Sequence, residues 1–228
     1  VVVVVVVVVV VEVEEHAAQG RGGVGARGVI TKDDDFTEHL FIASTHDTML
    51  FFTDRGKCYW LKVHQIPQGS RTSLGRAIVN LINCEPGEKV KAFVSIKDFN
   101  SDHYIIMATK NGMIKKSSLE LYSKPRKGGI FAIEIREGDE LIEAKITNGQ
   151  NNIILGTSSG KSILFKETDI RATGRKTMGV RGIRLGSSRD RLVGMIVASE
   201  EGTVLVASSK GLGTVSYTHL TLPTKRIV

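Results

Sequence analysis

The feature that most constrains this chain is a motif that recurs along it at intervals of roughly fifty residues. Each copy has an apolar run rich in strand formers, then Ser or Thr, two variable residues and Gly. The copies are Thr53–Gly56, Thr109–Gly112, Thr157–Gly160 and Ser208–Gly211. Strand-forming runs around a short polar turn with Gly predict a β-hairpin. In such a turn Gly supplies a positive φ, and the hydroxyl can bond local backbone.

Two further landmarks follow each of the first three hairpins. The first is a basic loop containing Gly, at residues 71–75, 126–129 and 175–179. The second is a polar or acidic turn, EPGEK, REGDE or SSRDR, that leads into another apolar strand. No segment keeps a 3.6-residue apolar period, so we expect few helices. A unit of about four strands repeated in tandem predicts an all-β, propeller-like or arrayed fold.

The ends of the chain differ in composition from the repeats. Residues 1–15 begin with a run of valine, which we interpret as artefactual, with pairing as an extra strand as the alternative. Residues 16–35 are predicted to be a Gly/Arg-rich box and linker. The blades are expected over 36–214, at about 36–100, 101–148, 149–199 and a partial 200–214. Residues 215–228 lack the Gly and charge pattern, so we predict a non-native tail and a fragment of a longer array.

The bulk composition narrows the classes of partner and compartment. Lys and Arg exceed Asp and Glu by seven, which favours a polyanionic partner. Two isolated cysteines, Cys58 and Cys84, are expected to be small buried hydrophobes in a reducing cytoplasm, and no metal site is predicted. We expect no membrane span and no signal peptide, because no suitable apolar or cleavable segment is visible.

Enzymatic motifs are weak in this sequence. Ser44, His46 and Asp47 have the residue types of a catalytic triad but are too close together to form one, so a polar turn is the better interpretation. Residues 20–25 fit GxGxxG, but no amphipathic helix follows, which argues against a dinucleotide site. The alternatives are a solvated loop, or an Arg-bearing loop whose backbone N–H groups approach phosphates.

Basic residues recur at equivalent places in successive modules. If the modules surround an axis, these charges form a belt on one rim that binds bent duplex DNA through its phosphates. Trp60 is the sole Trp, so stacking on single strands is less favoured. The predicted rim comprises Arg55, Lys57, Lys62, Arg71, Arg76, Lys115, Lys116, Arg126, Lys127, Arg175, Lys176 and Arg181.

Several stretches resemble a known family. Residues 33–67 are similar to the first blade of the C-terminal domain of the DNA gyrase A subunit, as are RAIVNL, GDELI, FKETDIRATGRKTMGVRGIRL and SSKGLGT. The resemblance runs from Gln19 to Thr214. It implies a β-pinwheel of four-stranded blades that exchange strands with their neighbours, with about three complete blades and a partial fourth in this chain.

The resemblance includes the Gln-Arg-Arg-Gly-Gly-basic-Gly box of the family. The matching residues are Gln19, Arg21, Gly22, Gly23 and Gly25. Gly20 and Val24 replace two basic residues, and Arg27 lies close enough to compensate partly. In the family this box precedes the first blade and is needed for DNA wrapping, so the resemblance implies DNA binding by Gln19 to Arg27.

The resemblance also implies a role within a larger enzyme. The holoenzyme contains two A and two B subunits, sits in the bacterial cytoplasm with the nucleoid, and introduces negative supercoils into DNA using ATP. The ATP and Mg²⁺ sites and the cleavage tyrosine lie in regions that this chain lacks, so no cofactor and no catalytic residue is expected here. The alternatives are the corresponding domain of topoisomerase IV, a propeller-type protein-binding scaffold, and a nucleotide-binding enzyme.

Overall fold

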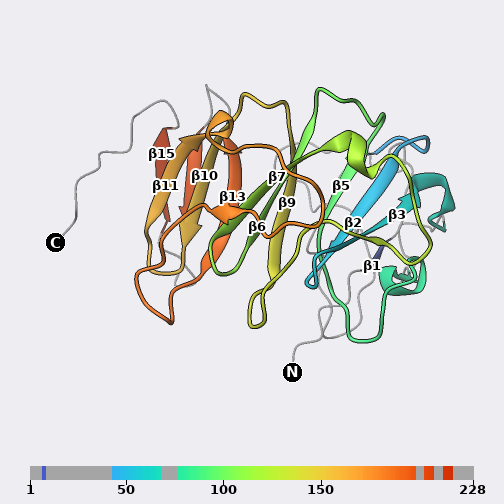
Figure 1. The fold of residues 1–228 in the computed structure, drawn as a ribbon, viewed down its shortest axis with the longest axis horizontal. Coiled ribbons are helices and arrows are strands. Elements are labelled where there is room, and N and C mark those ends of the chain that lie inside the picture. Colours follow the sequence, from blue (N-terminus) through green and yellow to red (C-terminus); the bar gives the residue numbers. More distant parts are fainter. Residues whose placement is uncertain (1–6, 9–42, 68–75, 199–202, 208–212, 218–228) are drawn as a thin grey trace, which may run out of the picture. The chain divides into compact units, whose positions relative to one another are not determined.

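The structure is a computed structural model that describes residues 7–8, 43–67, 76–198, 203–207 and 213–217. In these ranges the regular secondary structure consists of β-strands and short 3-10 helices, with no α-helix. Figure 1 labels most of these strands along the chain. The chain divides into two compact units. Unit 1 is Val1–Asp98 with Pro125–Ile130, and unit 2 is Phe99–Lys124 with Phe131–Val228. Residues 125–130 therefore leave the second module and complete the first.

Unit 1 is built around one antiparallel sheet with the strand order β5-β2-β3-β8. The strands are β2 (Thr48–Thr53), β3 (Lys57–Lys62), β5 (Val90–Ile96) and β8 (Ile130–Phe131). Every residue of β2 is buried, because β2 lies in the middle of the sheet. Its side chains pack with Tyr59, Leu61 and Ile78 in the core of this unit. The 3-10 helices η2 (Val63–Gln65) and η3 (Ile78–Asn80) follow β3 and β4 (Arg76–Ala77).

Unit 2 contains two such sheets, with the orders β12-β7-β6-β9 and β11-β10-β13. The first has β6 (Tyr104–Thr109), β7 (Met113–Ser118), β9 (Leu141–Thr147) and β12 (Val180–Arg181). The second has β10 (Asn152–Thr157), β11 (Ser162–Lys166) and β13 (Leu192–Ala198). The 3-10 helices η4 (Leu119–Tyr122) and η5 (Glu167–Asp169) follow β7 and β11. Ile106, Ile114, Leu155 and Met195 join the two sheets in one apolar core.

The predicted hairpins β2–β3, β6–β7 and β10–β11 are confirmed, and they agree in detail. The φ angles of Gly56, Gly112 and Gly160 are 77°, 80° and 80°. Each glycine N–H bonds the carbonyl of the Thr three residues earlier, at 2.9–3.0 Å. Each Thr hydroxyl accepts the N–H of the residue after the glycine, at 3.2–3.3 Å. The same register shift also precedes each Thr. Gly211 lies outside the described residues.

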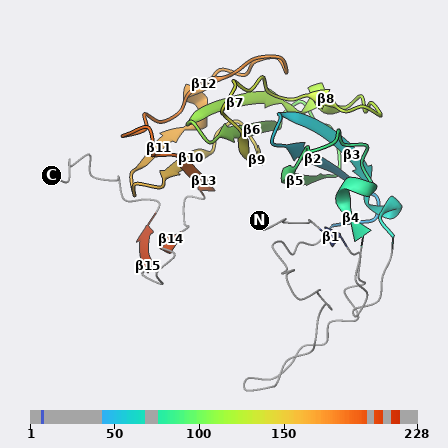
Figure 2. The same cartoon turned by 90° about the horizontal axis from the view of Figure 1, so that it is seen from below.

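The modules exchange short strands, as the resemblance implies. β8 pairs with β3, the outer strand of the preceding module. β12 likewise pairs with β7, the outer strand of the module before it, and lies beside β7 in Figure 2. In this pair Val180 is opposite Ile114 and Arg181 is opposite Met113. The propeller-like pinwheel class is therefore confirmed. The exchanged strands cover the outer edges of β3 and β7, which would otherwise expose unpaired backbone groups.

The described parts of the two ends differ from expectation. In the valine run β1 (Val7–Val8) pairs antiparallel with β4, which is the extra-strand alternative. At the other end β14 (Thr203–Ala207) pairs with β15 (Gly213–Tyr217), so β15 crosses the predicted boundary at Thr214. The alternating hydroxyl and apolar residues of TVSY suit a strand, and composition alone concealed this continuity.

Candidate nucleic-acid interface

Two of the predicted basic loops lie directly over the outer strand of the preceding module. We call residues 125–130 and 171–181 the crossing loops. Gly129, with φ 70°, passes over β3: an added Cβ would lie 2.8 Å from Cε1 of Tyr59 and 3.0 Å from the carbonyl oxygen of Cys58. Gly179, with φ 80°, passes over β7, where an added Cβ would lie 2.3 Å from the carbonyl oxygen of Ile114. Glycine at these two positions lets each loop approach the strand beneath it.

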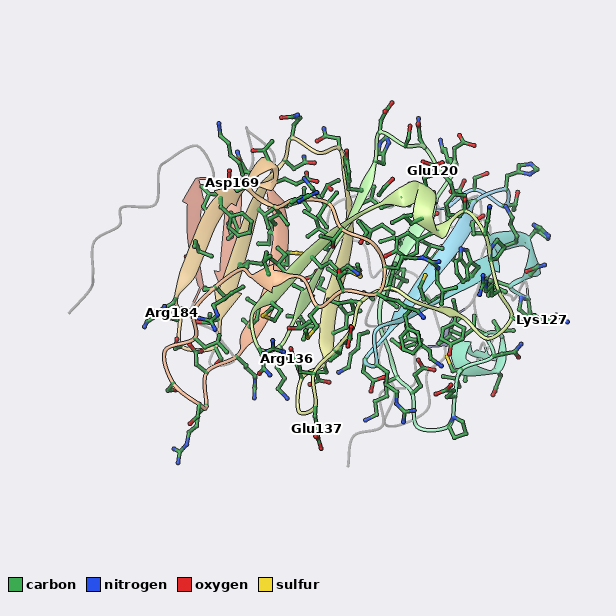
Figure 3. The ribbon with its side chains drawn as sticks, viewed as in Figure 1. Glu120, Lys127, Arg136, Glu137, Asp169 and Arg184 are labelled. Carbon is green, nitrogen blue, oxygen red and sulfur yellow. The ribbon has the colours of Figure 1, made fainter. Side chains whose placement is uncertain are left out.

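The crossing loops leave most of their basic side chains at the surface. Arg126 and Lys127 are exposed on the first loop. Figure 3 shows Lys127 at the surface. Lys176 and Arg181 are exposed on the second loop, and Arg175 is half-buried. Their contact with DNA stays a prediction, and the geometry it needs, a cation on a fixed backbone facing solvent, is present in both loops.

The second crossing loop is fixed by hydrogen bonds to unit 2. The N–H of Thr173 bonds the carbonyl of Lys116 at 2.9 Å, and the N–H of Glu134 bonds the carbonyl of Thr177 at 3.0 Å. The hydroxyls of Thr173 and Thr177 are 3.0 Å apart, and that of Thr177 donates to the carbonyl of Gly174 at 3.1 Å. A loop held this way loses little conformational entropy when it binds a ligand.

The prediction that Lys115 and Lys116 belong to an exposed rim is wrong. Lys115 is 1% exposed and Lys116 is 7% exposed. The ammonium of Lys115 donates to the carbonyls of Ala132 and Arg175. The ammonium of Lys116 donates to the carbonyl of Glu167 at 3.0 Å and lies 5.0 Å from the ring centre of Tyr104. Both ammonium groups are enclosed within unit 2 and cannot reach a bound duplex.

The two cations at the turn of the first hairpin, Arg55 and Lys57, both interact with the carboxylate of Glu85. Lys57 forms an ion pair with Glu85, and Arg55 lies 3.6 Å from the same carboxylate. The hydrogen bond from Lys57 lowers the pKa of Glu85 below its ordinary value, and the charges of Lys57 and Arg55 add to this effect. Glu85 therefore offsets part of the positive charge at this turn. Lys62 is exposed at the end of β3.

The remaining predicted contacts fall on parts of the chain whose side chains are not described. The box residues and the first basic loop lie outside the described residues, and only the backbone of Arg76 is described, in β4. Their roles stay predictions. The residues concerned are Gln19, Arg21, Gly22, Gly23, Gly25, Arg27 and Arg71.

Ser44 and Asp47 form the predicted polar turn. The N–H of Asp47 bonds the carbonyl of Ser44 at 3.0 Å. The Asp47 carboxylate accepts the N–H of Ser44 at 3.0 Å and the hydroxyl of Ser95 at 3.1 Å. No group of three or more potential metal ligands occurs among the described residues. In the same part of the chain, no helix has the length and apolar character to cross a membrane.

Sequence reasoning missed an acidic latch that is present in each of the three modules whose turns the structure describes. Thr53 donates to Glu88 at 2.5 Å, Thr109 donates to Asp139 at 2.7 Å, and Ser159 donates to Asp190 at 2.8 Å. Each acid comes from the polar turn that precedes the third strand of its sheet. The latch ties that turn to the hairpin turn. Acidic residues in these turns had looked like ordinary turn formers, because the partner lies 30 or more residues away.

Asp190 gives this latch a measurable pH dependence. Its carboxylate accepts N–H bonds from Gly186 and Ser159, both at 3.0 Å. These bonds, led by that from Gly186, hold the pKa of Asp190 well below its ordinary value, although burial opposes them. The stabilisation is therefore complete above the unfolded pKa of about 3.9 and is lost as the pH falls through the lower folded pKa.

Replacing Asp190 with Asn should lower the unfolding midpoint in denaturant at pH 7, because an amide group cannot accept every one of these bonds. The difference from the unmodified chain should shrink as the pH is lowered from 5 towards 2, since the aspartate of the unfolded chain then becomes protonated, which favours unfolding of the unmodified chain. Asp102→Asn, at an exposed position of unit 2, is the control and should leave the midpoint unchanged. A difference that stays constant with pH would contradict the latch.

A second group of exposed cations lies beside the sheet β11-β10-β13, near the turn between β10 and β11. The hydroxyl of Ser158 donates to Asp190 at 3.0 Å, which brings the turn after β10 beside the loop before β13. Figure 3 shows Arg184 and Arg136 towards the same end of unit 2, with Asp169 at the opposite end. In the sequence, the closely spaced arginines of RLGSSRDR could have indicated this cluster. The exposed cations of this cluster are Lys161, Arg184, Arg189 and Arg191.

Tandem antiparallel modules joined by exchanged strands, with basic crossing loops, define a propeller-like β-repeat protein with a cationic surface. The family model described as "DNA gyrase C-terminal domain, beta-propeller" matches residues 47–97, 103–148 and 151–199, more than half of the chain. The chain therefore belongs to the DNA gyrase C-terminal domain family.

Individual relatives agree with this assignment. The DNA gyrase A subunit of Klebsiella oxytoca is 42% identical over 197 residues, which cover 86% of this chain and 22% of the relative. This chain thus spans under a quarter of that relative. A crystal structure of the C-terminal domain of DNA topoisomerase IV has a TM-score of 0.68 and 28% identity, covering 76% of this chain and 54% of the other. A DNA gyrase A C-terminal domain structure also has a TM-score of 0.68, at 24% identity, covering 91% of this chain and 67% of the other, and shows the shared fold.

Proposed function

We propose that this chain is a DNA-binding and DNA-wrapping domain that holds duplex DNA through its phosphates. The observation that carries the proposal is the repeated crossing loop. In both described copies a glycine presses the backbone onto a buried strand while cations stay exposed beside it. Cations on a fixed backbone can contact phosphates with little loss of entropy, and phosphate contacts need no particular base sequence.

We propose further that the chain acts as part of a gyrase A polypeptide, within a complex with gyrase B and the cleavage region of gyrase A. The bending of duplex DNA by this domain would let the ATP-dependent enzyme introduce negative supercoils. ATP and Mg²⁺ would be used elsewhere in that complex, in the bacterial cytoplasm at the nucleoid. Membership of the gyrase C-terminal domain family supports this proposal.

The proposal is tested by binding of a random-sequence duplex as a function of salt. Affinity should fall steeply between about 50 and 200 mM salt, because each phosphate contact releases counterions. Arg126→Glu with Lys127→Glu should weaken binding and reduce the slope of log K against log salt by about 1.8, at about 0.9 per lost contact. Binding that is absent at low salt, or insensitive to salt, would overturn the proposal.

A matched control separates the crossing loop from net charge. Lys89→Glu with Lys97→Glu makes the same change of charge at exposed lysines of unit 1 outside the loop. This control should retain most of the slope. Ligation of nicked circles in the presence of each variant then reports wrapping, since a wrapped duplex shifts the distribution of topoisomers. A shift in topoisomers also distinguishes wrapping from the protein-binding scaffold, which predicts none.

A further inference from the structure

Lys115 links two separate segments to the interior of unit 2. It lies on β7 opposite Met107 of β6 and is 1% exposed. Its ammonium donates to the carbonyl of Ala132, at 2.6 Å, and to the carbonyl of Arg175. Ala132 is fully buried just after β8, whereas Arg175 belongs to the second crossing loop. The buried ammonium of Lys115 thus fixes the backbone of the loop at Arg175.

The other bonds of this loop hold its two sides but not Arg175. Thr173 is bonded to Lys116 on one side, and Thr177 is bonded to Glu134 on the other. Gly179 then passes over Ile114. The hydrogen bond to the Arg175 carbonyl comes from Lys115, at the tip between these anchors. Charged hydrogen bonds are roughly twice as strong as neutral ones, so the loss of this one should matter most at the tip.

We propose that Lys115 is a positioning residue for DNA binding, whose buried ammonium holds the tip of the second crossing loop so that the side chains of Arg175 and Lys176 meet the phosphates. This inference rests on the proposed function of the chain. Lys115 itself cannot touch DNA, because its side chain is enclosed. It acts through the backbone of Arg175. In the first module the equivalent position is Tyr59, which bonds Glu88 at 2.7 Å and leaves its crossing loop without such an anchor from this side chain.

The charge of Lys115 is sensitive to pH near neutrality. Burial, and then the positive charge of Arg175, lower its pKa to about 8, while Glu134 on the segment after β8 opposes the shift. Lys116, next along β7, points to the opposite face and bonds the carbonyl of Glu167. As the pH rises through 8, the folded chain loses this proton before the unfolded chain does.

The sign of this effect separates positioning from folding. Between about pH 8 and pH 10.4 the unfolded chain binds more protons than the folded chain at this group. The free energy of unfolding therefore rises as the pH increases through this interval. DNA binding should decline over the start of the same interval, since the charged bond to the Arg175 carbonyl becomes a weaker, neutral one. A residue that only stabilised the fold would make binding and stability change together.

The test compares the full chain with Lys115→Met, Lys115→Arg and the control Lys145→Met, an exposed lysine of β9 that pairs with Glu143 at 2.9 Å. The probe is a fluorescent random-sequence duplex at fixed ionic strength. At pH 7, Lys115→Met should lower the affinity by about tenfold. That loss is the cost of ordering one or two side chains on binding, which the unmodified chain avoids because its loop is already held. Its salt slope should stay unchanged, because no phosphate contact is removed. Lys145→Met should bind like the unmodified chain.

The pH profile completes the test. From pH 7 to pH 9 the unmodified chain should lose part of its advantage over Lys115→Met, because the neutral amine donates weaker bonds than the ammonium. Lys115→Arg should stay level, because arginine does not lose its proton. Should Lys115→Met fail to fold, the comparison with Lys115→Arg remains decisive. Equal pH profiles for lysine and arginine would overturn the inference while leaving the DNA-binding proposal intact. Absence of salt-dependent binding by the unmodified chain would instead reject that proposal.

Discussion

Replacing Gly179 with alanine should lower the free energy of unfolding by about 2 to 5 kcal/mol, because two independent costs coincide at this residue. The φ of 80° lies in the left-handed region, where an L side chain costs about 1 to 2 kcal/mol. The added Cβ would also lie 2.3 Å from the carbonyl oxygen of Ile114, and backbone cannot move aside cheaply. The crossing loop would have to lift from β7.

Two further glycines of unit 2 separate these costs. Gly160 has the same φ of 80°, with no atom within 4 Å of an added Cβ, so Gly160→Ala should cost about 1 kcal/mol. Gly174 has open space and no positive φ, so Gly174→Ala should be neutral or slightly stabilising. Chemical denaturation of the three variants measures the series. Equal losses for Gly179 and Gly160 would show that the close approach to Ile114 contributes nothing.

Removal of the Glu167 side chain should be comparably damaging, at about 3 to 5 kcal/mol, because it breaks a buried ionic contact. Glu167 is fully buried at the start of η5. Its carboxylate accepts the hydroxyl of Thr147 at 2.6 Å and the N–H of Gly149 at 3.1 Å, and lies 3.9 Å from the ammonium of Lys116. Glu167→Ala leaves these donors buried with fewer acceptors, and such groups are costly to leave unpaired.

The control for this variant lies two residues away. Asp169 belongs to the same 3-10 helix but is exposed, at the far end of unit 2 from Arg184 (Figure 3). Asp169→Ala should change the free energy of unfolding by less than about 0.5 kcal/mol. Glu167→Gln should fall between the two, since its amide accepts one bond but turns a donor towards the N–H groups of Gly149 and Asn151. A loss for Glu167→Ala no larger than that for Asp169→Ala would contradict the role of the buried carboxylate.

Much of this fold follows from local sequence, because its turns depend on local chemistry. Glycine three residues after Thr predicted the hairpins, and the hydroxyl bonds the backbone as expected. The basic loops with their glycines were also visible in sequence. The role of these glycines could not be read from the sequence, since each one crosses a strand of the preceding module: Gly129 crosses β3 and Gly179 crosses β7.

The error over Lys115 has a physical reason and had a detectable signal. Two adjacent lysines in a strand normally indicate solvent, since burying an ammonium is costly without partners. The partners of Lys115 are backbone carbonyls 17 and 60 residues away, which carry no side-chain signal. Counting from the hairpin glycines, however, aligns Lys115 with Tyr59, a large residue suited to burial. Alignment of the modules on Gly56 and Gly112 would have predicted an interior position.

The exchanged strands also affect how the chain folds while it is being synthesised. β3 ends at Lys62, but the strand β8 that covers its outer edge begins at Ile130. At about 5 to 20 residues per second, that edge waits on the order of several seconds for its partner. An uncovered edge can pair with another chain, so each module is most vulnerable to misassembly until the next one has been synthesised.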